Sequence, residues 1–133
     1  MPPKPQIQGV AIGLSITLVA CTAAHRAAAP LDVDRLVAAV AQVESGGRNC
    51  KPYWDVNAYR WGVFAISKVR WVEIGGRADT WGKASPDLQR KLVRKALASR
   101  CRSFETVARY WNGAGKAHFK YAVKLAKAYR SAK

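Results

Sequence analysis

The stretch Asp32–Gly47, DVDRLVAAVAQVESGG, decides the fold that we predict for this chain. Its apolar residues recur at the spacing of one helix face, at Val33, Val37 and Val40, and Glu44 follows on that face. Gly46 and Gly47 are a typical helix stop, and Asp32 or Asp34 is suited to cap the beginning. The sequence therefore predicts a helix whose apolar face ends in a carboxylate.

Glu44 is expected in the last turn of this helix, beside unpaired carbonyl groups and the negative end of the helix dipole. Both neighbours disfavour an ionised carboxylate, and so does partial burial against the valines. We therefore expect the pKa of Glu44 to lie above its usual value, so that the side chain can donate a proton near neutral pH. A solvated glutamate at a frayed helix end is the alternative.

Length and charge limit the classes of protein to consider. A chain of 133 residues predicts one domain, and half of the residues are apolar, which excludes a disordered chain. The formal charge of +15 predicts an anionic partner, and nucleic acid, anionic lipid and the carboxylate-rich cell wall all qualify. No Cys/His spacing is typical of a metal site, and neither a metal nor a cofactor is expected.

Residues 1–20 have the features of an export segment. Ile7–Ala20 is an uncharged apolar run and small residues follow it, but a membrane span needs about 20 residues. The sequence LVAC, residues 18–21, resembles the lipobox of bacterial lipoproteins, in which Cys21 would receive lipid. An uncleaved signal anchor reaching Ala24 and an apolar helix packed within the fold are the alternatives.

These features predict an exported protein of the periplasm or cell envelope, with a signal peptide or membrane anchor over residues 1–20 and a linker over residues 21–31. The domain then covers residues 32–133, and a place in a virion is the alternative location. In an oxidising compartment, Cys50 and Cys101 are left to form a disulfide. Two unpaired buried thiols are the alternative.

The rest of the chain predicts a mainly α-helical domain. Residues 48–60 have no periodicity and predict a loop, and residues 61–71 predict either a buried strand or the start of a helix. Helices are expected over 85–99, with Ser85 and Pro86 at its start, over 104–111 and over 116–130. The predicted buried residues of the first and last of these helices are Leu88, Leu92, Val93, Leu97, Phe119, Ala122, Val123, Ala126 and Tyr129.

Basic residues form a stripe along the last predicted helix, at Lys116, Lys120, Lys124, Lys127 and Arg130. Such a stripe is typical of a solvated face, and contact with an anionic wall, lipid or nucleic acid is the alternative. No nucleic-acid module and no interleaved stacking aromatics accompany the charge, so no specific nucleic-acid partner is expected.

Three stretches together carry a resemblance to a known family. They are VAQVESG at residues 40–46, NAYRWGVFAI at residues 57–66 and ARYWNG at residues 108–113. In order and spacing they resemble the lysozyme-like domain of lytic transglycosylases and related muramidases, in which a helix ends in Glu-Ser-Gly. The resemblance covers about residues 32–130.

The resemblance implies that Glu44 protonates the glycosidic oxygen between N-acetylmuramic acid and N-acetylglucosamine in peptidoglycan, and then acts as a base. It implies that Ser45 holds the glutamate or the substrate by a hydrogen bond, with a simple helix cap as the alternative. Trp111 and Asn112 correspond to the aromatic-Asn pair of the family that touches the sugar. Further substrate contacts are expected from Phe64 and from Tyr59, whose flat ring can stack on a sugar.

Hydrolysis instead of transglycosylation requires a second carboxylate, and Asp55 is the best candidate for it. The sequence departs from the family pattern at Ala65, where the family carries a glutamine that binds the glycan. A different class of function also fits: a non-catalytic glycan-binding or structural protein of a phage or secretion apparatus that retains the fold.

Overall fold

The computed structural model describes residues 29–113 and 117–132, and shows a mainly helical chain with a small sheet. The expected export segment and Cys21 lie outside the described residues. The helices are α2 (Val33–Ser45), α3 (Lys68–Glu73), the 3-10 helix η1 (Ala78–Thr80), α4 (Pro86–Ala98), α5 (Phe104–Asn112) and α6 (Ala117–Ser131). The strands are β1 (Cys50–Trp54), β2 (Tyr59–Gly62) and β3 (Ile66–Ser67), and they form one antiparallel sheet in this order.

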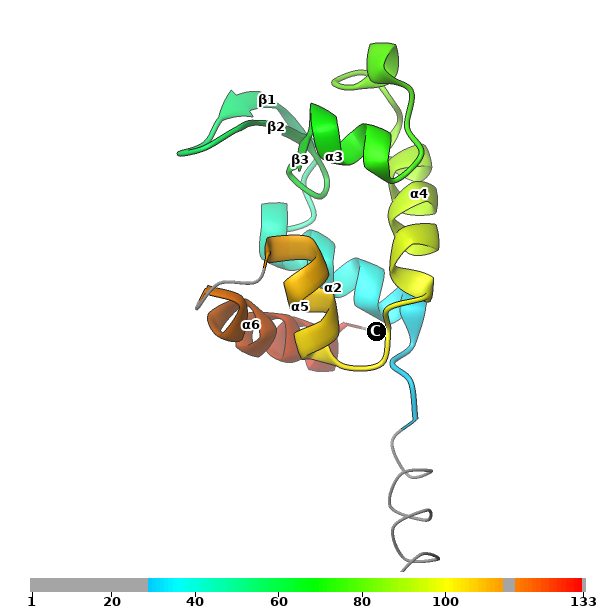
Figure 1. Ribbon diagram of the computed structural model, residues 1–133, viewed down its shortest axis with the longest axis vertical. Helices are drawn as coiled ribbons and strands as arrows, with labels where there is room; N and C mark the ends of the chain where they lie inside the picture. Colours follow the sequence, from blue (N-terminus) through cyan, green and yellow to red (C-terminus); the bar gives the residue numbers. More distant parts are fainter. Residues whose placement is uncertain (1–28, 114–116, 133) are drawn as a thin grey trace, which may run out of the picture.

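The helix α2 lies in the middle of the molecule (Figure 1). It packs against α4 on one side and α6 on the other, and α5 packs on α6. The sheet and α3 lie together beyond the C-terminal end of α2. This order places the end of α2 between the sheet and the pair formed by α5 and α6.

The prediction for α2 is confirmed. The side chain of Asp32 accepts a hydrogen bond from the backbone N–H of Arg35 at 2.9 Å, which caps the beginning. Gly46 ends the helix in the left-handed conformation, at φ 67°. Leu36 and Val40 are completely buried, so the apolar face of this helix is the centre of the core.

The predicted loop over residues 48–60 is wrong, because most of it is the hairpin of β1 and β2. The side chains of β1 are exposed or half-buried, and a bulge between Cys50 and Tyr53 interrupts its register. Both features remove the alternation that identifies a strand in a sequence. Residues 61–71 contain both predicted alternatives, since they end β2, form β3 and begin α3.

Ser85 and Pro86 begin α4 as predicted, but its buried face is different. Leu88 is exposed, and Gln89 is completely buried in its place. The amide oxygen of Gln89 accepts a hydrogen bond from the N–H of Val63 at 2.8 Å, and its amide nitrogen donates to Asn49 at 3.1 Å. A buried amide with these partners fixes the end of β2 against α4.

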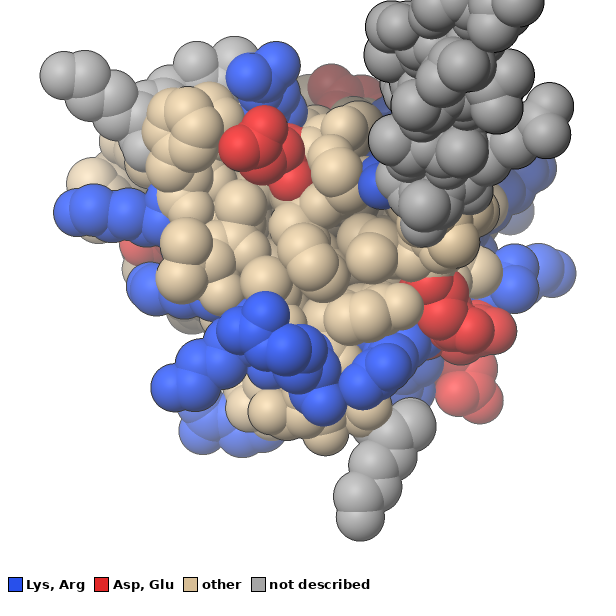
Figure 2. All heavy atoms as spheres, turned by 90° about the horizontal axis from the view of Figure 1, so that it is seen from below, with Lys and Arg blue, Asp and Glu red and all other residues tan. Residues whose placement is uncertain are grey.

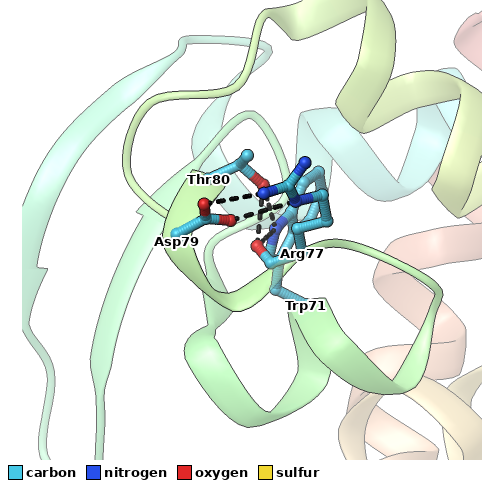
Figure 3. Close-up of polar contacts among 4 residues, drawn as sticks. All are labelled: Trp71, Arg77, Asp79 and Thr80. Carbon is cyan, nitrogen blue, oxygen red and sulfur yellow. Dashed lines mark hydrogen bonds and ion pairs between the residues drawn. The ribbon is translucent and has the colours of Figure 1, made fainter.

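The segment between α3 and α4 folds around the buried indole of Trp71 (Figure 3). The indole N–H of Trp71 donates to the carbonyl of Arg77 at 2.9 Å and lies 3.1 Å from the hydroxyl of Thr80. Gly76 covers the ring so closely that a Cβ there would lie 2.2 Å from an indole carbon. A side chain larger than hydrogen is therefore excluded at Gly76.

The last helix is confirmed, but two of its predicted inward residues are not. Phe119 and Val123 are 55% and 70% exposed. Tyr121 and Leu125 are buried instead, together with Ala122. Apolar residues are present on both sides of this helix, and hydrophobicity alone therefore did not identify the inner side.

The predicted disulfide is wrong, since Cys50 and Cys101 are both free. Cys50 begins β1, whereas Cys101 follows the C-terminal end of α4, far from the sheet (Figure 1). The thiol of Cys101 instead donates to the carbonyl of Ala98 at 3.2 Å. Within residues 29–113 and 117–132, no helix has the length and apolar character needed to cross a membrane.

Candidate active site

Glu44 lies in the last turn of α2, next to the sheet and α6. Its side chain is half-buried, and its Oε1 accepts a hydrogen bond from the hydroxyl of Tyr121 at 2.9 Å. Tyr121 is buried in α6, so a rigid group from a second helix fixes the carboxyl. The fold therefore holds this carboxyl in one position, unlike the carboxyl of a freely rotating surface glutamate.

Burial raises the pKa of Glu44 above its ordinary value, as predicted. Hydrogen bonds from Tyr121 and Trp111 and the positive charge of Arg60 oppose this shift, because each favours the ionised carboxylate. The pKa of Tyr121 is also raised, by burial and by the neighbouring carboxylate, so its hydroxyl remains a donor. The arrangement produces an acid that can give up a proton and whose anion still has partners.

Trp111 and Asn112 end α5, and Trp111 is near enough to Glu44 to affect its pKa. Trp111 is half-buried and its indole lowers the pKa of Glu44, while Asn112 is exposed. The ring of Phe64 contacts Trp111 edge-on, with 6.3 Å between the ring centres, but Phe64 is completely buried. The expected contact of Phe64 with a substrate is therefore wrong, and its role is to support Trp111 from below.

Ser45 does not contact the carboxyl of Glu44 among its described hydrogen bonds. Its buried hydroxyl lies 2.6 Å from the carbonyl of Val63 and 3.2 Å from that of Ala41, and can donate to either. Substrate cannot reach a side chain in this position. Ser45 therefore joins the end of α2 to the turn after β2, and this rigid joint keeps Glu44 in place.

Asp55 is in the turn between β1 and β2, and it forms an ion pair with Arg60 at 3.1 Å. Both groups are near enough to Glu44 to affect its pKa, which Asp55 raises and Arg60 lowers. Arg60 also donates to the carbonyl of Ala65 at 3.2 Å. Asp55 is thus a carboxylate close enough to affect the predicted acid, Glu44. Its own charge is already paired with that of Arg60.

Aromatic rings extend from the surface of the hairpin into the core. Trp54 is 79% exposed and contacts the ring of Tyr59, which in turn contacts Trp81, with ring centres 5.1 and 5.3 Å apart. Trp61 continues the row inward and is almost completely buried. The two outer rings, Trp54 and Tyr59, offer flat apolar surfaces for stacking on sugar rings, whereas the inner rings support them.

A pocket of about 260 Å³ lies between the sheet and the end of α5. Arg60 and Trp111, which both affect the pKa of Glu44, line it together with Asn112, Arg70 and Ala65, whereas Glu44 itself is not one of the lining residues. Ala65 is buried with φ 50°, in the left-handed region that side chains other than glycine rarely adopt. Ala65, at which the resemblance leads one to expect a glutamine, thus lies at the pocket wall together with Arg60 and Arg70.

The sequence did not identify Tyr121 and Arg60 as neighbours of Glu44. Tyr121 lies opposite the basic stripe and four residues before buried Leu125, and this spacing was the available signal. Arg60 carried no signal, because it reaches Glu44 only through the hairpin that was predicted as a loop. Among the described residues, no group of three or more His, Cys, Asp or Glu side chains is arranged to hold a metal ion.

No protein-family model, curated protein or solved structure gives a significant match to this chain.

Proposed function

We propose that this protein is a peptidoglycan lytic transglycosylase with a lysozyme-like domain, and that Glu44 is its catalytic acid and base. The observation that carries the proposal is the state of Glu44: a half-buried carboxyl of raised pKa that accepts a hydrogen bond from Tyr121. Such a shift, produced by burial at a defined position, is typical of catalytic acids. The three sequence stretches that resemble the family support the same function.

The proposed reaction requires two proton transfers at Glu44, one from the carboxyl and a second, of a different proton, back to it. Protonated Glu44 gives its proton to the oxygen that links N-acetylmuramic acid to N-acetylglucosamine, and the bond from this oxygen to C1 of the muramoyl sugar breaks. The C6 hydroxyl of the same sugar then attacks C1, and its proton passes to Glu44. The products are a 1,6-anhydro sugar and a free glycan end, and the acid is regenerated. Tyr121 and Trp111 stabilise the carboxylate between the two transfers by hydrogen bonds.

The ion pair of Asp55 with Arg60 favours transglycosylation over hydrolysis. A hydrolase needs a second carboxylate to activate water or to trap the sugar, and the carboxylate of Asp55 is already engaged in an ion pair with Arg60. Transglycosylation uses the sugar's own hydroxyl and needs Glu44 alone. We therefore assign Asp55 a role in holding Arg60 near the pocket.

Trp111, Asn112 and Tyr59 are the proposed sugar contacts. Asn112 and Trp111 line the pocket between the sheet and α5, and Tyr59 offers an exposed ring on the hairpin. We further propose that residues 1–20 direct export, with lipid on Cys21 or an uncleaved anchor keeping the domain at the membrane side of the cell wall.

Digestion of purified peptidoglycan by the full chain tests this function. The wild type is expected to release muropeptides lighter by one water than hydrolytic products, as measured by mass spectrometry. Glu44→Gln is expected to abolish release, because the amide cannot donate the proton, and Asp55→Asn is expected to retain the anhydro product. Reducing-end products, or full activity of Glu44→Gln, would contradict the proposal.

A non-catalytic glycan-binding protein is the second candidate, and the exposed rings of Trp54 and Tyr59 favour it. It predicts that wild type and Glu44→Gln bind peptidoglycan equally and that neither releases fragments. Trp54→Ala would then weaken sedimentation with the wall in both backgrounds.

A further inference from the structure

The outward side of α6 combines positive charge with exposed apolar side chains. We call it the outer face, and it consists of Phe119, Lys120, Val123, Lys124, Lys127 and Arg130. The opposite side of the same helix holds Tyr121 against Glu44. The outer face therefore plays no part in the proposed reaction, and its composition needs another explanation.

Phe119 and Val123 are one helical turn apart, and more than half of each side chain is exposed. Lys120 and Lys124 stand directly next to them in the sequence and are exposed as well. Lone surface apolar residues are common, but a Phe and Val pair within a row of lysines is the pattern of helices that lie in a lipid–water interface.

An apolar groove borders the outer face. It measures about 520 Å³, lies between α2 and α6, and is lined mainly by aliphatic atoms with Lys124 and Lys127 at its edge. In the view from below (Figure 2), Lys and Arg side chains border a broad area of uncharged side chains. A nucleic acid or a wall polymer would use the charges but would leave the apolar pair and this groove in water. A lipid uses all three, because its head group is anionic and its tail is apolar.

The chain enters the domain beside the C-terminal end of α6. The N–H of Asp32 donates to the hydroxyl of Tyr129 at 2.9 Å, and Arg35 donates to the carbonyls of Arg130 and Ala132 at 3.0 and 2.9 Å. The sequence that precedes this point contains the uncharged apolar run Ile7–Ala20. Chain entry next to the outer face favours a lipid bilayer over other anionic partners.

We propose that the outer face of α6 lies on the surface of an anionic lipid bilayer, with Phe119 and Val123 inserted among the lipids and the lysines on the head groups. Each lysine near such a surface contributes on the order of 1 kcal/mol, which corresponds to about a fivefold change in partitioning. Because Tyr121 is on the other side of α6, the carboxyl of Glu44 stays away from the lipid.

Lysine acylation of the full chain, read by mass spectrometry, tests this contact. The chain is bound to vesicles of phosphatidylcholine alone or of phosphatidylcholine mixed with phosphatidylglycerol, and a water-soluble reagent then modifies accessible lysines. Lys120, Lys124 and Lys127 are expected to lose reactivity only on the vesicles with phosphatidylglycerol. Lys68, Lys91 and Lys95 are exposed on α3 and α4 and serve as internal controls.

Matched variants test the apolar part of the contact. Phe119→Ser with Val123→Ser is expected to restore the reactivity of the three α6 lysines on anionic vesicles. The control pair, Val69→Ser with Val72→Ser, removes two exposed valines from α3 and is expected to leave the protection unchanged.

Three results would overturn the proposal. They are unprotected α6 lysines on anionic vesicles, equal protection of the control lysines, and protection that survives the loss of Phe119 and Val123. Equal protection by a soluble polyanion such as DNA, unaffected by the serine pair, would assign the face to a polymer instead.

Discussion

At the scale of single residues, the hydrogen bond between Glu44 and Tyr121 joins α2 to α6 through two residues that are 77 positions apart in the sequence. It balances two opposite effects on the same carboxyl, since burial raises the pKa of Glu44 and the tyrosine hydroxyl lowers it. Burial therefore favours the neutral acid, and the tyrosine hydroxyl favours the anion. A group that first donates and then accepts a proton needs this balance.

Removal of the tyrosine hydroxyl is expected to shift the pH dependence of cleavage. Cleavage by the wild type should decline as pH rises through the raised pKa of Glu44, since the acid loses its proton. Tyr121→Phe removes a donor that favours the carboxylate, so the pKa rises further and the decline moves to higher pH. The measurement is the initial rate of wall clearing against pH.

Tyr110→Phe is the control for this variant, because Tyr110 contacts Arg100 through its ring, which phenylalanine retains. An unchanged pH profile for Tyr121→Phe, or an equal shift for both variants, would contradict the role given to the hydroxyl.

Glu44→Gln is also expected to change stability with a defined sign. Because the folded-state pKa of Glu44 is raised, its favourable contribution is complete below the unfolded value of 4.5 and is lost as pH rises through the folded value. The glutamine variant has no charge to bury. The melting temperature of the variant minus that of the wild type should therefore increase as pH rises through the folded-state pKa of Glu44. Above that pH the difference should stay constant.

A thermal melt series from acid to mildly alkaline pH measures this difference. A wild type that gains on the variant with rising pH would show that the carboxylate, not the acid, is the form stabilised by the fold.

The place of a single residue in the structure could be predicted from the sequence only where the residues that determine it are close to it in the chain. Glu44 was identified because the valines, the carboxylate and the glycine stop lie within one helix. Tyr121 was missed because the ring could be recognised as internal only once α6 had been placed against α2. Phe64 was misassigned for a related reason: its motif gives its place in the chain but not its depth in the core.

At the scale of elements, helix termini were predicted well and the sheet was not. Ser85 and Pro86 begin α4 through a side-chain cap and a fixed φ, both of which act within one turn. The hairpin of β1 and β2 instead depends on pairing between strands that have little apolar patterning of their own. Gln89 shows the same limit, since only its partners at Val63 and Asn49 explain a buried amide.

The segment around Trp71 provides a test of packing at this scale. Gly76→Ala would force a methyl group into the indole ring, and we expect it to lower the free energy of unfolding by about 3 kcal/mol, the upper part of the range for overpacking. Gly46→Ala serves as the control, because its Cβ would meet no atom within 4 Å. Its left-handed conformation alone should cost about 1 kcal/mol.

Urea unfolding of the two variants measures both values. Equal losses for Gly76→Ala and Gly46→Ala would show that the Trp71 ring can move aside.

At the scale of the whole molecule, the two sides of α6 separate two tasks. The inner side fixes the carboxyl through Tyr121, and the outer side presents the lysines, Phe119 and Val123. The charge of +15 predicted an anionic partner but could not locate the contact. The position that we propose for it on α6 rests on the way in which this helix packs on α2 and α5, which leaves the basic side outward.

The free cysteines also have a consequence at this scale. Within the described residues no covalent cross-link is present, so the core around Leu36, Trp71 and Leu125 stabilises the fold without an oxidising environment. The prediction of a disulfide failed because the presence of two cysteines in a sequence gives no information on the distance between them.

The bonds of Asp32 and Arg35 to the end of α6 bring the first and last described parts of the domain side by side. A domain whose two ends lie together can be circularly permuted. A short linker would join the two ends, and new termini could be placed in the turn at Val56, which is 93% exposed. The same geometry lets the domain sit as an insert within a loop of a larger host protein. It can thus be moved between molecular contexts as a unit, because both of its connections leave from one place.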